Sequence, residues 1–182
     1  MKKTIFYPGL ILLFVSCTMN TIDVQGHRGA RGLRPENTLE GFEFAMDLGV
    51  STLELDLAVT KDRHVLVTHN PYVSAHLCLN EDGSIIQADS GAQFSGPLIR
   101  DLTLEEIKKF DCGSINPNPS QFLEPPRINI PGAQMPTLTE VFDLINKKKS
   151  NVHLNIEMKI DPRYDVTIPE VEFVNAVVKV IQ

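Results

Sequence analysis

The sequence has no tryptophan, few other aromatic residues and only three cysteines among its 182 residues. Its 17 lysines and arginines are outnumbered by 23 aspartates and glutamates, so the net charge is −6. This shortage of positive charge argues against a nucleic-acid-binding surface built on bulk electrostatics. It does not exclude a small anionic substrate, because a local pair of basic side chains can hold a phosphate group in an acidic protein.

The N-terminal region lacks an apolar run long enough to span a bilayer, since its apolar stretch covers only residues 5–15. Two lysines precede this stretch, and Ser16 and Cys17 follow it, which resembles a bacterial lipoprotein signal. We therefore expect residues 1–16 to be a signal peptide and Cys17 to carry lipid. The protein would then be exported to the periplasm or cell envelope, attached to the membrane only through this anchor. Ordinary secretory cleavage at another position is the alternative.

Two cysteines remain if Cys17 is lipidated. In an exported protein, Cys78 and Cys112 could form a disulfide. Two unpaired, small apolar residues fit the sequence equally well. Their spacing does not match a metal-binding motif.

Hydrophobic periodicity predicts an α/β fold. Strands are expected at residues 22–27, 52–58, 64–69 and 152–159, and helices at 36–48, 103–110, 137–149 and 169–182. Because helices connect the strands, we expect a parallel sheet. Residues 70–135 are rich in Pro, Gly, Asn and Ser and predict an insertion over a functional site.

Polar residues share one face of the predicted strands, because side chains alternate across a strand. Glu54 and Asp56 alternate with leucines, and Glu157 alternates with other apolar residues. A half-exposed antiparallel sheet would give the same alternation. In a parallel barrel, however, the polar face lines the interior, and His27 and His69 fall at the strand ends where active sites lie.

Three carboxylates on one face are unfavourable unless a cation neutralises them. Oxygen ligands favour Ca²⁺ or Mg²⁺ over zinc, so Glu54, Asp56 and Glu157 are candidate metal ligands. The two histidines could bind a metal as well, but their positions equally suit a general acid and a general base. Arg28 and Lys159 supply positive charge for an anion. Together these groups predict phosphoester chemistry.

Three segments resemble the glycerophosphodiester phosphodiesterase family. They are HRGARGLRPENT at 27–38, ELDLAVTKDRHVLVTHNP at 54–71 and NIEMK at 155–159, and the resemblance extends over residues 22–182. It implies a TIM (β/α)₈-type barrel with a small insertion after the third strand. It also implies metal-dependent hydrolysis of glycerophosphodiesters to sn-glycerol 3-phosphate and an alcohol.

The resemblance assigns expected roles to individual residues. His27 and His69 match the catalytic acid/base pair, and Glu54, Asp56 and Glu157 match metal ligands. The positions that match substrate or phosphate binding are Arg28, Lys159, Glu36 and Asn37. One departure is Asn70, where many family members have Asp after the second histidine.

The predicted strands are too few to close a barrel. We expect a barrel truncated after about four β/α units, arising from a shortened or split reading frame, or one that associates with itself to cover its open edges. Two other functions stay open: a phospholipase D-like or sphingomyelin-cleaving enzyme of the same barrel type, and an inactive truncated envelope protein.

Overall fold

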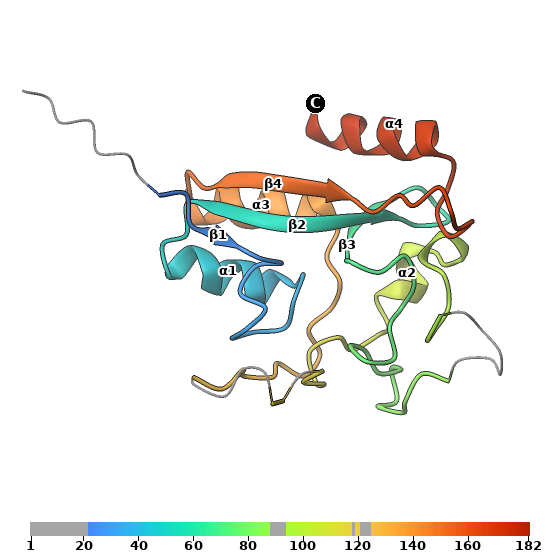
Figure 1. The fold of residues 1–182 in the computed structure, drawn as a ribbon, viewed down its shortest axis with the longest axis horizontal. Helices are drawn as coiled ribbons and strands as arrows, with labels where there is room; N and C mark the ends of the chain where they lie inside the picture. The colour runs from blue at the N-terminus through green and yellow to red at the C-terminus, as the bar shows by residue number, and fades with distance from the viewer. Residues whose placement is uncertain (1–21, 88–93, 118, 121–124) are drawn as a thin grey trace, which may run out of the picture.

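The computed structural model describes residues 22–87, 94–117, 119–120 and 125–182 (Figure 1). The predicted signal peptide and Cys17 lie outside these residues. The elements, in chain order, are β1 (Gln25–Gly26), α1 (Leu39–Asp47), β2 (Thr52–Val59), β3 (Val65–Val67), η1 (Ile99–Asp101), α2 (Leu104–Ile107), α3 (Leu138–Lys148), β4 (His153–Met158) and α4 (Glu170–Ile181). In this described part, no helix combines the length and apolar character needed to cross a membrane.

Strand β2 is the centre of a four-stranded open sheet. Its residue Thr52 pairs with Gln25 of β1 on one edge and with His153 of β4 on the other, both in parallel. Strand β3 pairs with the C-terminal end of β2, on the same edge of β2 as β1. The α/β class is as predicted, and β2 and β4 form close to the expected positions.

The prediction that all strands are parallel is wrong for β3, which runs antiparallel to β2 with Val67 opposite Leu57. The link between them is residues 60–64 alone, and a parallel crossover needs about a dozen residues or more. A tight turn forms instead, in which the Arg63 N–H donates to the Thr60 carbonyl and Arg63 has φ 67°. The described sheet therefore contains three parallel strands and one antiparallel strand, and β2 is followed by β3 rather than by a helix.

Local hydrogen bonds fix where the helices begin. The Thr38 hydroxyl accepts from the Gly41 N–H at the start of α1. Helices α2 and α3 both begin with capping boxes, in which a threonine and a glutamate three residues later satisfy each other's backbone N–H groups. Thr103 followed three residues later by Glu106 is the sequence pattern that predicts such a box, and the structure confirms it. Gly49, with φ 81°, follows α1 as expected of a helix stop.

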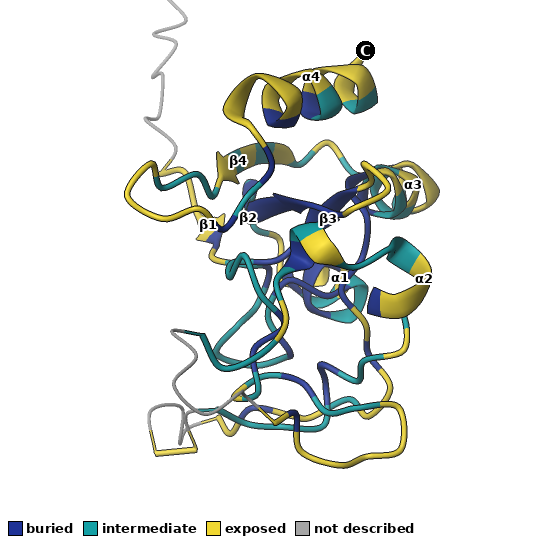
Figure 2. Cartoon of the chain, turned by 90° about the vertical axis from the view of Figure 1, so that its right-hand side faces the viewer, coloured by how far each residue is buried: buried dark blue, intermediate teal, exposed yellow. Residues whose placement is uncertain are grey.

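The main core lies on the apolar face of β2. Leu53, Leu55 and Leu57 are fully buried there, as the strand alternation predicted. Phe42 of α1 and Val141 of α3 belong to the same cluster, together with residues of α4. Figure 2 shows the buried strands between α4 and the other helices. The polar face of β2 is therefore left for the site.

The chain makes a long excursion from the sheet between β3 and α3, over residues 68–136. It has a second apolar cluster, which includes Ile99 and Ile107, and Cys78 and Cys112 are joined in a disulfide within it. The disulfide decides between the two alternatives that the sequence left open. The excursion returns to the sheet where the Val67 N–H donates to the Pro136 carbonyl at 2.7 Å.

Within the described residues, β1 and β3 lie along one edge of β2 and β4 lies along the other, and this open sheet does not close into a barrel. Helix α4 leaves Val171 72% and Ile181 55% exposed. Nothing in these residues tests the predicted self-association, which stays a prediction.

We expect Leu55→Ala to lower the free energy of unfolding by about 3 kcal/mol, because it removes buried methyl groups and leaves a cavity. The matched control is Leu48→Ala, since Leu48 is 59% exposed and should cost less than about 0.5 kcal/mol. Urea denaturation followed by circular dichroism measures both. Similar losses in the two variants would contradict this description of the core.

Candidate active site

The loop at residues 27–38 starts where β1 ends and runs over the polar face of the sheet. Arg28 and Gly29 both have positive φ, 51° and 79°, which turns the chain back toward β2. A Cβ on Gly29 would lie 2.9 Å from the backbone carbon of Gly41, so this close approach requires glycine. The Arg28 N–H donates to Oε2 of Glu54 at 2.7 Å. These contacts hold the loop against β2.

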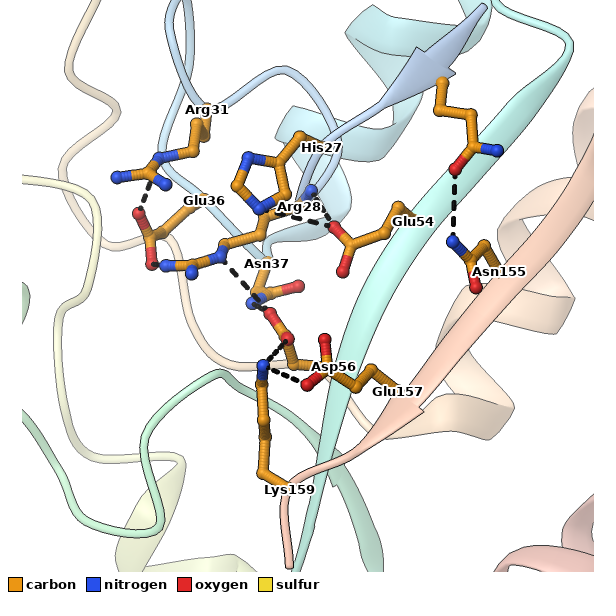
Figure 3. Close-up of polar contacts among 11 residues, drawn as sticks. His27, Arg28, Arg31, Glu36, Asn37, Glu54, Asp56, Asn155, Glu157 and Lys159 are labelled. Atoms are coloured by element: carbon orange, nitrogen blue, oxygen red, sulfur yellow. Dashed lines mark hydrogen bonds and ion pairs between the residues drawn. The ribbon is translucent and has the colours of Figure 1, made fainter. Parts of the chain in front are cut away.

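Three carboxylates meet on the polar face (Figure 3). Glu54 and Asp56 come from β2, and Glu157 stands on β4 directly opposite Asp56 in the strand register. One oxygen from each lies within 4.8 Å of the others. The structure thus brings together the three residues predicted as metal ligands.

Asp56 is the most buried member of this cluster, with 1% exposure. Its Oδ2 accepts from the amide of Asn37 at 2.9 Å and lies 3.3 Å from Nε of Arg28. Its Oδ1 lies 3.0 Å from Nζ of Lys159. Two cations and an amide therefore compensate one buried charge.

Lys159 bridges two of the three carboxylates. Its Nζ lies 3.0 Å from Asp56 and donates to Oε1 of Glu157 at 2.5 Å. Burial disfavours the charged ammonium, but the hydrogen bonds to Glu157 and Asp56 outweigh it and raise the pKa of Lys159. The ammonium stays protonated at neutral pH and keeps a positive charge at the cluster.

Glu36 organises the arginines of the loop. Its Oε1 accepts from Nη1 of Arg28 at 2.7 Å, and its Oε2 lies 3.5 Å from Nε of Arg31. Figure 3 shows the Arg28 side chain running from Glu36 to Asp56. The guanidinium is thus held between two carboxylates beside the cluster.

The two candidate catalytic histidines lie in different surroundings. His27 is 57% exposed at its side chain, and its Nε2 lies 3.9 Å from Oε2 of Glu54. His69 lines a cavity together with Glu157 and Lys159. It reaches this place because antiparallel β3 brings the chain back beside Asp56, whose carbonyl accepts from the Thr68 N–H. Its position therefore does not come from a parallel strand end, as the sequence suggested.

Asn70 contacts the neighbouring histidine directly. Nδ1 of His69 lies 3.1 Å from Oδ1 of Asn70. A carbonyl oxygen can only accept, so this contact favours the tautomer of His69 that carries its proton on Nδ1. An Asp at position 70 could orient the ring in the same way, so the amide preserves this function.

The carboxylate cluster fits a hard divalent cation. All three of its donors are oxygens, the ligand type that Ca²⁺ and Mg²⁺ prefer. Beside them, the buried Oδ1 of Asn37 has no hydrogen-bond partner among the described protein atoms. A buried acceptor of this kind requires a partner such as a cation or water. Its presence agrees with a charged ligand at this place.

Arg127 was not predicted as a residue of this region, yet it braces the first loop. The Arg127 side chain donates to the backbone carbonyls of Arg34 and Ile115. Its neighbour Ile128 donates its N–H to the Leu33 carbonyl. Burial lowers the pKa of Arg127, partly opposed by the charge of Glu36. A single arginine in a proline-rich segment carries no periodic signal that could have revealed this role.

Comparison with known proteins decides the family. The sequence model of the glycerophosphoryl diester phosphodiesterase family matches residues 27–182. The chain belongs to this family. A glycerophosphodiester phosphodiesterase of Caldanaerobacter subterraneus subsp. tengcongensis is 36% identical over 137 residues, which cover 75% of this chain and 46% of the relative.

Solved structures agree with this placement. A crystal structure from Silicibacter pomeroyi is 31% identical with a TM-score of 0.73, and the match covers 88% of this chain and 52% of that one. An Oleispira antarctica phosphodiesterase in complex with the product sn-glycerol 3-phosphate is 26% identical with a TM-score of 0.62, over 88% and 51% of the two chains. The family's structures imply a TIM-barrel-type fold. The chain spans about half the length of these relatives.

We expect Arg127→Met to lower the free energy of unfolding by about 2 kcal/mol, because two partly buried carbonyl groups lose their donor. Arg63→Met is the matched control, since Arg63 pairs with Glu172 where both side chains are about half exposed. That pair should contribute less than about 1 kcal/mol. Urea denaturation distinguishes the two, and an equal effect would show that Arg127 does not brace the loop.

Proposed function

We propose that this chain carries the catalytic residues for hydrolysis of a glycerophosphodiester to sn-glycerol 3-phosphate and an alcohol. The observation that carries the proposal is the polar face of the sheet, where three carboxylates, two basic side chains and His27 gather. The family match, the name of the Caldanaerobacter relative and the product bound to the Oleispira enzyme support it. They favour this reaction over the sphingomyelin-cleaving alternative.

Glu54, Asp56 and Glu157 would hold a divalent cation, Ca²⁺ or Mg²⁺. When bound, such a cation neutralises charge on the non-bridging phosphate oxygens. Arg28 and Lys159 lie beside the cluster and would add positive charge toward the same oxygens. Their own contacts with Asp56 fix them before any substrate arrives, so little reorganisation is needed.

The two histidines would move protons on opposite sides of the phosphorus. One accepts a proton from the attacking water as its oxygen forms the new P–O bond. The other donates a proton to the alcohol oxygen as the old P–O bond breaks. Imidazole suits both tasks because its unperturbed pKa lies near neutrality. Glu36 and Asn37 would hold Arg28 and Asp56 in place for this reaction.

We also propose export of the protein and a lipid anchor at Cys17. The basic, apolar and small-residue pattern of residues 1–17 supports this. The disulfide between Cys78 and Cys112 supports it independently, because disulfides persist in oxidising compartments.

The direct test is release of sn-glycerol 3-phosphate from glycerophosphoethanolamine by the purified chain without residues 1–16. Reactions contain Ca²⁺ or Mg²⁺, or a chelator. We expect release only with a divalent cation. Release that persists in chelator would overturn the metal requirement, and absence of release under all conditions would count against activity of this chain.

His27→Ala and His69→Ala should each lower kcat by roughly 100-fold or more, the scale of general acid–base catalysis. The control is His64→Ala, because the His64 side chain is half exposed. In the described structure, the one carboxylate that it pairs with is that of Asp62. Steady-state kinetics with saturating metal measure all three. Near-normal kcat in either of the first two variants would remove that histidine from the mechanism.

Glu54→Gln should raise the metal concentration needed for half-maximal activity by about tenfold or more, because a charged ligand is lost. The control is Glu81→Gln, because Glu81 lies in an exposed turn of the excursion. This change removes the same charge at a position away from the cluster. Titration of activity with Ca²⁺ and Mg²⁺ compares the two. An unchanged metal requirement in Glu54→Gln would exclude Glu54 from the ligand set.

A further inference from the structure

A cavity of about 350 Å³ opens next to the carboxylate cluster. His69 and Lys159 form its wall on the side of the cluster. Phe94, Tyr164 and Asp161 lie further along its lining. The cavity therefore starts at the proposed phosphate position and continues into aromatic surroundings that the reaction itself does not require.

Three aromatic rings are packed together at this cavity. The ring centroids of Phe94 and Tyr164 lie 6.5 Å apart, and the ring planes meet at 87°. Tyr72 packs against Phe94 with a centroid distance of 5.0 Å. Tyr164 is 44% exposed, so its ring is accessible to a ligand. Two rings at right angles offer more than one aromatic surface to a single bound group.

The Tyr164 ring already attracts a cation of the protein itself. The guanidinium of Arg163 lies 5.6 Å from the ring centroid. The same guanidinium binds both oxygens of Asp161, and these hydrogen bonds lower the pKa of Asp161 to about 2. Because Arg163 pairs with Asp161 and Lys159 with Glu157, the local charges are balanced and the ring faces decide what binds.

We propose that this cavity binds the alcohol group of the substrate and selects a quaternary ammonium group, as in a choline ester of glycerol phosphate. Aromatic faces bind such groups because their π electrons attract the charge while the methyl groups need no hydrogen bonds. This proposal rests on the proposed function, since it assigns the part of the substrate that lies beyond the phosphate.

The lining fits a methylated cation better than a polyol. Besides the two rings, Pro71, Met158 and Val166 contribute apolar surface to the cavity. A polyol placed against this surface would lose hydrogen bonds to water without gaining new ones, which is unfavourable. A quaternary ammonium has no donors to satisfy, so it loses less on entering.

The first test measures direct binding of choline and of 3,3-dimethylbutanol, its uncharged isostere. Saturation-transfer NMR on the methyl protons of each probe detects the binding. We expect choline to bind about fivefold more tightly. Tyr164→Leu should abolish this preference, and Tyr164→Phe, which keeps the ring, should retain it. Equal binding of the two probes, or binding of neither, would overturn the proposal.

The second test separates this proposal from the proposed function. The kcat/KM of glycerophosphocholine is compared with that of glycerophosphoglycerol in the wild type, Phe94→Leu and Tyr164→Leu. We expect a wild-type preference for the choline ester of about fivefold or more that both variants reduce. Metal-dependent hydrolysis without preference would overturn the subsite and leave the proposed function standing. Selective choline binding without hydrolysis of any diester would support the subsite and count against the proposed function.

Discussion

A buried carboxylate organises the polar face of the sheet. Asp56 is 1% exposed in the middle of β2, where an uncompensated charge would be strongly destabilising. Its compensation comes from three side chains in two places of the chain: Asn37 and Arg28 in the first loop, and Lys159 just beyond β4. One charge in the central strand thus fixes both the loop above it and the end of the neighbouring parallel strand. The helices on the opposite face stabilise β2 itself, so core packing and site geometry meet in a single strand.

The compensation is shared rather than paired one to one. Arg28 lies between Glu36 and Asp56, and Lys159 lies between Asp56 and Glu157. Removing one member of such a network leaves a buried partner without its counter-charge, which is more damaging than breaking an exposed pair. Arg28, Asp56 and Lys159 therefore hold one another in place without a ligand, which is the preorganisation that the proposed function needs.

Much of this arrangement could be predicted from the sequence, because strand alternation and helix caps are local signals. The leucines and carboxylates of β2 lie on the faces expected of them, and Thr103 caps its helix. The direction of β3 was missed because helical links elsewhere suggested a parallel sheet throughout. The shortness of residues 60–64 was the signal that could have corrected it. Arg127 could not be found at all, since its partners are backbone carbonyls far away in the chain.

The excursion at residues 68–136 leaves and re-enters the sheet at neighbouring points, since Leu66 is bridged to Thr137, and it has its own apolar cluster with a disulfide. Loops whose ends are already held together can change in length at a small entropic cost. The excursion carries Phe94 of the cavity, against which Tyr72 packs, whereas the carboxylates belong to the strands. A chain built this way can diverge in one region without disturbing the other. Related proteins could therefore acquire new preferences by remodelling the excursion while their sheet stays unchanged.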